Sequence, residues 1–305
     1  MFSSSMLWLV VQAAATDSTW PRIHAAALAF PDTAAARAAG FVPLARGQVQ
    51  DLSPFQGQHW FRRDRLLEHE TRVDAPSFVM FVPMNGVMKP VGLAYSARIG
   101  HDEPVPRELD GVETPWHLHQ MCLRIPGEGG ALADGVDDCR AQGGTPTPRQ
   151  IAMVHAWTGS PSPEGRYAHD NVALPYLAVG LAAPAAADLA DPERAGRARQ
   201  LGLALGETYG ARLPYARRVE LMNQDARLAD SLARRRSALG ALVPGLVAAQ
   251  QDGDRAKWDE LAARAVAEWK TLFALYTSIA STPVIRTQLE RQHERALGSA
   301  GHSHH

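Results

Sequence analysis

The chain is poor in cysteine, with only Cys122 and Cys139 among its 305 residues. Two cysteines exclude a scaffold held by several disulfides and a zinc module built from many cysteines. Long apolar runs are missing as well, since no stretch approaches the ~20 residues that a membrane-spanning helix needs. The sequence therefore predicts no integral membrane segment.

Two catalytic patterns are also absent. Gly-x-Ser-x-Gly does not occur, and the glycine-rich segment 127–130 lacks the helix and lysine that complete a phosphate-binding loop. Nucleophilic Ser/His/Asp catalysis has no support in the sequence.

An excess of charge of either sign is missing too. Lys and Arg total 31, Asp and Glu total 32, and the formal net charge is −1 at pH 7. This balance supplies no general attraction to nucleic acid or to an anionic membrane, so nucleic acid is not an expected partner. With 46% hydrophobic and 21% charged residues, the composition is that of a globular protein with one large core or two smaller ones.

Residues 1–15 form a candidate signal segment. They contain a short apolar run, 6–11, followed by small residues of the kind that signal peptidase recognises. We therefore expect a periplasmic or secreted protein. A cytoplasmic location is the alternative, because no Lys or Arg precedes the run and the run is short.

The rest of the chain divides by composition into two halves. Residues 20–182 are rich in Pro, Gly, His and aromatic residues, and short apolar segments alternate with turn signals, as is typical of strands. Residues 184–298 are rich in Ala, Leu, Arg and Glu, and residues 299–305 are a His-rich tail that we expect to be disordered. The expected fold class is α+β, a β-rich N-terminal unit with a metal-binding role followed by an α-helical bundle.

Local signals place several elements. Asn85-Gly86 predicts a hairpin turn between strands at 78–82 and 91–95. Apolar residues spaced by three and four between 258 and 276 predict a helix that Asp254 caps and Pro283 follows. Further expected elements are a helix at 32–39, strands at 121–125 and 151–157, and a last helix at 283–297. A helical stretch is expected at 192–249, which Gly210, Pro214 and Pro244 should break or kink.

The 12 histidines carry most of the functional information. His117 and His119 are two residues apart, so in a strand both imidazoles project from one face and reach a single ion. His155 lies in an otherwise apolar strand, where a buried imidazole needs a partner, and it is the leading candidate for a third ligand. His59 is the next candidate.

Three neutral histidines with an open fourth position suit zinc, copper or iron, and the open position permits activation of water or binding of oxygen. Cys122 is either a fifth candidate ligand, as a thiolate, or the partner of Cys139 in a disulfide, and these two roles exclude each other. The alternative interpretation is that the histidines are hydrogen-bonded core residues. We interpret His169 as a loop residue that forms hydrogen bonds rather than as a ligand.

Several segments between about residues 30 and 177 together resemble a group of uncharacterised bacterial exported proteins. The matching positions are His59, Trp116, His117, His119, Cys122, His155, Trp157, Gly165 and Asn171. The resemblance implies export and a shared role for these histidines. A weaker similarity, to cupins, is limited to the His-x-His pair and a later histidine, because Arg124 stands where cupins have their acidic ligand.

Three functions follow from these observations. The first is an exported transition-metal-binding protein that catalyses metal-assisted hydrolysis or oxygen chemistry on a small-molecule substrate. The second is a metal carrier or sensor without catalytic activity, and the third is a structural or interaction protein without a metal.

Overall fold

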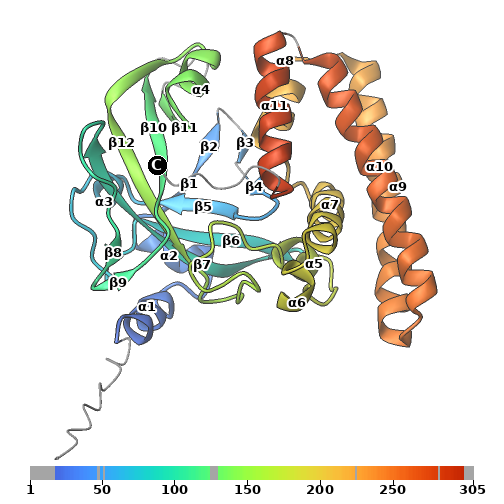
Figure 1. Ribbon diagram of the computed structural model, residues 1–305, viewed down its shortest axis with the longest axis horizontal. Helices are drawn as coiled ribbons and strands as arrows, with labels where there is room; N and C mark the ends of the chain where they lie inside the picture. Colours follow the sequence, from blue (N-terminus) through green and yellow to red (C-terminus); the bar gives the residue numbers. More distant parts are fainter. Residues whose placement is uncertain are drawn as a thin grey trace, which may run out of the picture.

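A curled antiparallel sheet and a set of helices beside it make up the computed structural model (Figure 1). It describes residues 18–46, 49–50, 52–123, 130–223, 225–280 and 282–298. The candidate signal segment 1–15, the tail 299–305 and Arg124 lie outside these residues. The α+β fold class is confirmed.

The main sheet has the strand order β1-β5-β6-β7-β12-β10-β11, with β4 paired to β5, and curls into a half-barrel. All its pairings are antiparallel. Its strands are β1 (Val42–Pro43), β4 (Leu52–Ser53), β5 (Gly57–Phe61), β6 (Phe78–Met84), β7 (Val87–Gly100), β10 (His117–Leu123), β11 (Gly130–Ala133) and β12 (Thr145–Ala156). Two small hairpins pair β2 (Ala45–Arg46) with β3 (Val49–Gln50) and β8 (Glu108–Leu109) with β9 (Val112–Glu113).

The predicted hairpin at Asn85-Gly86 is confirmed. The two residues have φ values of 50° and 76° and join β6 to β7. Positive φ at both central positions is what a two-residue turn with the twist of the flanking strands requires, and Asn and Gly reach it at the lowest cost. The predicted strand at 151–157 matches the end of β12 up to Ala156, whereas β10 begins earlier than the predicted 121–125.

Alternation along the strands gives the sheet two different faces. One face buries Trp60, Trp116 and Leu93, and α1 (Thr19–Ala27) and α2 (Thr33–Ala38) pack against β7. The opposite face buries a second cluster that includes Met80 and Met153. The helix at α2 is as predicted, with Asp32 accepting a hydrogen bond from the Ala35 N–H at 2.8 Å, whereas α1 was not anticipated.

Most of the helices come after the sheet. They are α5 (Leu174–Ala178), α6 (Ala186–Leu189), α7 (Pro192–Thr208), α8 (Pro214–Met222), α9 (Ala226–Asp252), α10 (Arg255–Ile279) and α11 (Pro283–Ala296), whereas α3 (Arg63–Leu66) and α4 (Val136–Ala141) lie within the β-rich part. The predicted helices α10 and α11 are present, and Asp254 caps α10 through the Lys257 N–H. Pro244 was expected to break or kink the helical stretch, and it does not break it, because α9 continues through this residue.

The α9–α10 hairpin forms the outer side of the helical half, and α7, α8 and α11 lie between it and the sheet (Figure 1). Phe55, from the β-rich half, is buried in the same core as the helices. A Cβ on Gly202 of α7 would lie 2.7 Å from Cε1 of Phe55, so only glycine permits this close approach. The helical half is therefore in direct contact with the start of β5.

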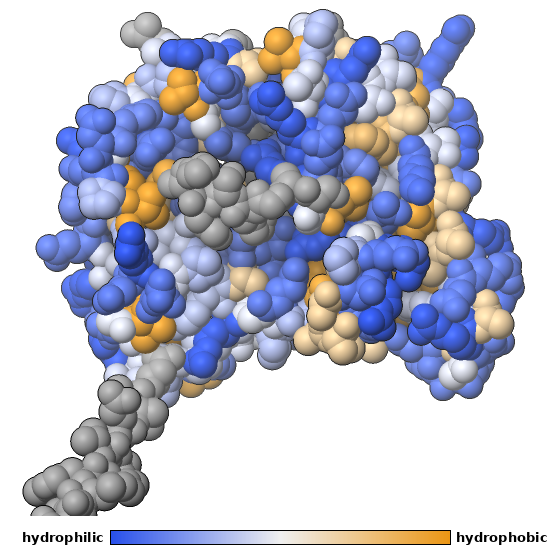
Figure 2. Space-filling view, in the orientation of Figure 1, coloured by the Kyte–Doolittle hydropathy of each residue, from blue (hydrophilic) through white to orange (hydrophobic). Residues whose placement is uncertain are grey.

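None of the helices in the described ranges is both long and apolar enough to cross a membrane. The face of the molecule in Figure 2 is mostly hydrophilic, with hydrophobic residues singly or in small groups.

Candidate metal-binding site

The predicted histidines come from three strands. His59 lies on β5, His117 and His119 on β10, and His155 on β12. His117 is paired with Met153 and His119 with Ile151 across β10 and β12. Met153 and Ile151 both belong to the second buried cluster, so the two histidines point to that face of the sheet. The expectation that His117 and His119 share a face is met.

Curvature of the sheet brings His59 to His155. Their strands are separated by β6 and β7, which in a flat sheet would place them about 14 Å apart. The two Nε2 atoms are nevertheless 3.3 Å apart. The histidines therefore lie on the concave face of the half-barrel.

His155 is held in one orientation by a backbone carbonyl. Its Nδ1 lies 2.6 Å from the carbonyl oxygen of His169. A carbonyl only accepts, so Nδ1 carries the proton and the lone pair of His155 is on Nε2, toward His59. A carbonyl bonded to the far nitrogen of an imidazole is the usual arrangement around a metal-ligating histidine.

His117 occupies the centre of the group. Its ring centroid lies 4.9 Å from that of His119, 5.0 Å from that of His155 and 4.3 Å from that of His169. Both ring nitrogens of His117 are buried and have no hydrogen-bond partner among the described residues. A buried imidazole without partners costs free energy, which a bound ligand would recover. We call His59, His117, His119, His155 and His169 the histidine cluster.

Burial keeps the inner histidines neutral. Desolvation lowers the pKa of His117 and of His155 well below 6.5, and repulsion by the neighbouring histidines lowers it further. A neutral imidazole offers the lone pair that a metal ion requires, without the loss of a proton at neutral pH.

His169 is in a different electrostatic state. Its Nδ1 lies 3.0 Å from Oδ1 of Asp170. Burial lowers the pKa of His169, but the Asp170 carboxylate outweighs burial and the pKa is raised. The pKa of Asp170 is lowered, because attraction to His169 and Arg199 outweighs its burial. Gln56 also approaches this pair, its Nε2 lying 3.2 Å from Oδ1 of Asp170 and 3.3 Å from Nε2 of His169.

His119 and His169 reach solvent. The side chain of His119 is 20% exposed and that of His169 is 31% exposed. Nδ1 of His119 lies 4.0 Å from a carboxylate oxygen of Asp134, which in turn pairs with Arg295 of α11. The cluster is thus closed at His155 and His59, which are both buried, and open at His119 and His169.

Cys122 does not belong to the cluster, which corrects the expectation of a thiolate ligand. Its sulfur forms a disulfide with Cys139 of α4, and both residues are buried together with Ala133 in a separate small cluster. A disulfide sulfur has no thiolate to offer a metal.

The positions of the side chains fit a metal ion in part. Two nitrogens at about 2.0–2.1 Å from one tetrahedral zinc ion lie about 3.3–3.4 Å apart, the separation found between His59 and His155. Within the part of the chain that the structure describes, however, no group of three or more His, Cys, Asp or Glu residues is arranged to hold a metal ion. A third ligand for an ion between His59 and His155 therefore requires the rearrangement of a neighbouring side chain.

Sequence reasoning missed His169 as a member of the cluster and did not identify Asp170 or Arg199. The adjacent His169 and Asp170 could have indicated a functional histidine from the sequence, because a carboxylate next to a histidine fixes the charge and tautomer of the imidazole. Arg199 has no such signal, since it lies in the helical half and meets Asp170 only through the fold.

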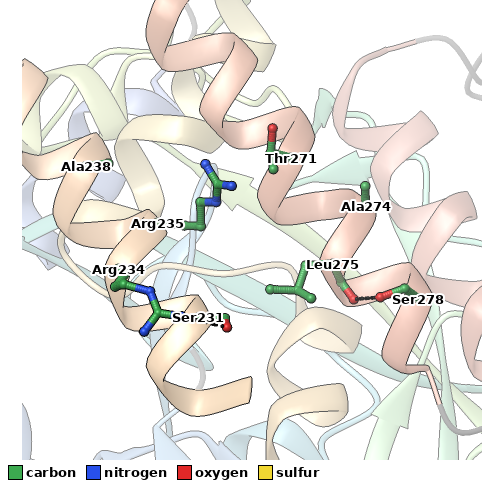
Figure 3. Close-up of a pocket in the computed structure, with 8 residues that line it drawn as sticks. All are labelled: Ser231, Arg234, Arg235, Ala238, Thr271, Ala274, Leu275 and Ser278. Atoms are coloured by element: carbon green, nitrogen blue, oxygen red, sulfur yellow. Dashed lines mark hydrogen bonds between the residues drawn. The ribbon is translucent and has the colours of Figure 1, made fainter. Parts of the chain in front are cut away.

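A groove between α9 and α10 is separate from the cluster (Figure 3). Its lining contains two arginines and three hydroxyl side chains but no histidine or carboxylate: Ser231, Arg234, Arg235, Ala238, Thr271, Ala274, Leu275 and Ser278. Arg235 pairs with Glu268, and Arg234 donates to Ser231. Both arginines of the groove are thus already paired within the protein, and its lining contains no histidine or carboxylate. The histidine cluster is therefore the stronger candidate for a functional site.

Comparison of the chain with protein-family models, curated proteins and solved structures finds no significant match.

Proposed function

We propose that the histidine cluster binds one transition metal ion, with His59, His117 and His155 as the inner ligands. The observation that supports this most strongly is the pair of Nε2 atoms at 3.3 Å, one of them fixed as an acceptor by the His169 carbonyl. The buried and unpartnered His117 next to them supplies the third donor after a ring rotation. Neutral imidazoles suit zinc, copper or iron.

A metal-dependent enzyme is favoured over a closed carrier. The disulfide removes Cys122 from the ligand set, so a His/Cys site that fills all four positions loses its thiolate. The partly exposed His119 and His169 leave one side of the cluster open to solvent. An ion held by three inner histidines there has room for water, oxygen or a small-molecule substrate, and supplies Lewis-acid, hydrolytic or oxygen chemistry.

Export is part of the proposal. The disulfide between Cys122 and Cys139 supports an oxidising compartment, because disulfides persist mainly in exported proteins. The candidate signal segment points the same way, and we propose a periplasmic or secreted location.

Elemental analysis tests metal binding. The protein should be truncated after residue 298 and carry no tag, because His302, His304 and His305 would otherwise bind metal on their own. We expect about one transition-metal ion per chain in the parent protein and little in His117→Ala or His155→Ala. His69→Ala is the control, since His69 is exposed and pairs with Glu103, outside the cluster. Equal metal content in all four proteins contradicts the proposal and favours the structural interpretation of the histidines.

The open position can be tested on the Co²⁺-substituted protein. An enzyme-like site should bind azide, with a change in the visible absorption bands of Co²⁺. A spectrum that azide does not change favours the carrier instead.

A further inference from the structure

The helical half reaches the histidine cluster through Arg199 of α7. The Arg199 side chain is only 8% exposed, and its guanidinium makes three polar contacts. One nitrogen lies 2.6 Å from Glu164 Oε1, and the other lies 3.2 Å from Asp170 Oδ2 and 3.2 Å from the Ala296 carbonyl oxygen. Arg199 therefore joins the loop after β12 to α7 and to the end of α11.

The same guanidinium also lies over the ring of Phe55, at 5.5 Å from its centroid. Phe55 immediately precedes Gln56, which approaches both His169 and Asp170. Two independent routes thus connect Arg199 to residues 169 and 170.

A short chain of contacts leads from Arg199 to the inner ligand His155. Arg199 holds one carboxylate oxygen of Asp170, and the other lies 3.0 Å from Nδ1 of His169. This fixes residue 169 by its side chain. Its backbone carbonyl is the group that accepts the Nδ1 proton of His155 at 2.6 Å.

We propose that Arg199 is a positioning residue, through which the helical half holds the His169 carbonyl in place and keeps the lone pair of His155 on Nε2. His155 then faces His59 ready to bind a metal ion. The part of this inference that concerns metal affinity rests on the proposed function, whereas the part that concerns the tautomer of His155 does not.

The residue type suits this role. The planar guanidinium offers a fork of donors that bridges two carboxylates at once, which the single ammonium group of lysine cannot reproduce. Without the guanidinium, the Glu164 and Asp170 carboxylates lose the cation between them and repel each other. The loop that carries His169 then loses its fixed position. We expect this loss in Arg199→Lys as well, although lysine keeps the positive charge.

The tautomer can be measured in the metal-free protein. With selective ¹⁵N labelling of histidine, long-range ¹H–¹⁵N correlation spectra distinguish a protonated Nδ1 from a protonated Nε2. We expect a protonated Nδ1 at His155 in the parent protein, and a mixture of tautomers in Arg199→Met and Arg199→Lys. Arg197→Met is the matched control, because Arg197 lies on the same helix, is exposed and pairs with Glu193 rather than with the loop after β12.

Metal affinity supplies the second measurement. Loss of an outer-shell partner of a ligand weakens metal binding by about 10–100-fold. We expect a loss of this size for Co²⁺ in Arg199→Met and Arg199→Lys, with altered Co²⁺ absorption bands, and no change in Arg197→Met. Leu272→Ala controls for general loss of stability, because Leu272 is fully buried in the helical core and its side chain has no polar group that could take part in these contacts. It should lower the melting temperature and leave the Co²⁺ affinity unchanged.

The outcomes separate the two proposals. A parent protein that binds no Co²⁺ contradicts the proposed function, whereas an unchanged His155 tautomer in Arg199→Met contradicts the present inference. A Co²⁺ affinity that falls equally in Leu272→Ala and Arg199→Met also overturns it, since general instability then explains both losses. If Arg199→Met does not fold, Asp170→Asn interrupts the same chain with a nearly isosteric side chain, and an unchanged tautomer there has the same meaning.

Discussion

His59 and His155 place their Nε2 atoms 3.3 Å apart although their strands are not neighbours in the sheet. Two neutral imidazoles at this distance share one proton, with His59 as donor and His155 as acceptor, unless an ion takes its place. The contact depends on the curl of the sheet. Its stability therefore depends on pH, on strand packing and on the helices that hold the loop after β12.

Acid should destabilise the metal-free protein. The pKa values of His117 and His155 in the folded protein lie well below 6.5, chiefly because both side chains are buried. The unfolded chain therefore binds more protons than the folded chain below pH 6.5. The stabilisation from these neutral histidines is fully present above pH 6.5 and is lost as the pH falls toward their pKa values in the folded protein. The loss is up to about 1.4 kcal/mol per pH unit for each histidine.

The measurement is the free energy of unfolding in urea with a chelator present, between pH 7.5 and 5.5. His117→Leu should reduce the slope of the free energy of unfolding against pH by the contribution of one histidine. The contribution of His169 to the pH dependence of stability has the opposite sign, since its pKa is raised and its contribution is lost as the pH rises. Equal slopes in the parent protein and in His117→Leu would show that His117 is not buried in its neutral form.

Removal of the disulfide should reduce stability but not metal binding. Cys122 and Cys139 close a loop with a sequence separation of 17 residues, for which the loss is about 3 kcal/mol. Because the disulfide lies in its own buried cluster, the Cys122→Ala/Cys139→Ala variant should keep the metal content of the parent protein. Denaturant unfolding and elemental analysis check the two parts. A loss of metal as large as in His117→Ala would restore Cys122 as a ligand.

The sequence was most informative where the structure is local. The turn at Asn85-Gly86, the cap at Asp254 and the shared face of His117 and His119 each depend on a few neighbouring residues, and each was predicted correctly. The proximity of His59 to His155 could be proposed only from residue type. It arises from the accumulated curl of four strands, which no short pattern encodes.

Tertiary contacts decided what local patterns left open. Pro244 was expected to break or kink a helix, because proline lacks a donor and clashes with the preceding turn. α9 nevertheless continues, with Leu242 and Leu246 buried on either side of Pro244 in the helical core. His169 is, as predicted, a loop residue that forms hydrogen bonds, but its two contacts with the cluster, a carbonyl toward His155 and a ring beside His117, exist only after folding.

A buried ion network should stabilise the helical bundle. Arg236 of α9 donates from Nε to the buried Glu207 at 2.8 Å and from a terminal nitrogen to Glu220 and Tyr276. Arg236→Met leaves two partly uncompensated carboxylates, and we expect a loss of about 3–5 kcal/mol. Arg235→Met, next to it on the same helix, removes only a solvent-exposed pair with Glu268 and should cost less than about 1 kcal/mol. Similar losses in the two variants would contradict a stabilising role for the buried network.

Gly92 of β7 should be required for the geometry of the cluster. A Cβ at this position would lie 2.6 Å from the carbonyl oxygen of Ala156, which follows His155, and 2.8 Å from the end of the Met80 side chain. The methionine can move, but the backbone of β12 cannot yield without a shift of His155 relative to His59. We expect Gly92→Ala to cost about 1–3 kcal/mol and to weaken Co²⁺ binding. Gly196→Ala, in open space on α7, is the control and should be neutral or slightly stabilising. Unchanged Co²⁺ affinity in a destabilised Gly92→Ala would show that the cluster tolerates a shift of β12, and that the ligands do not depend on the spacing seen between His59 and His155.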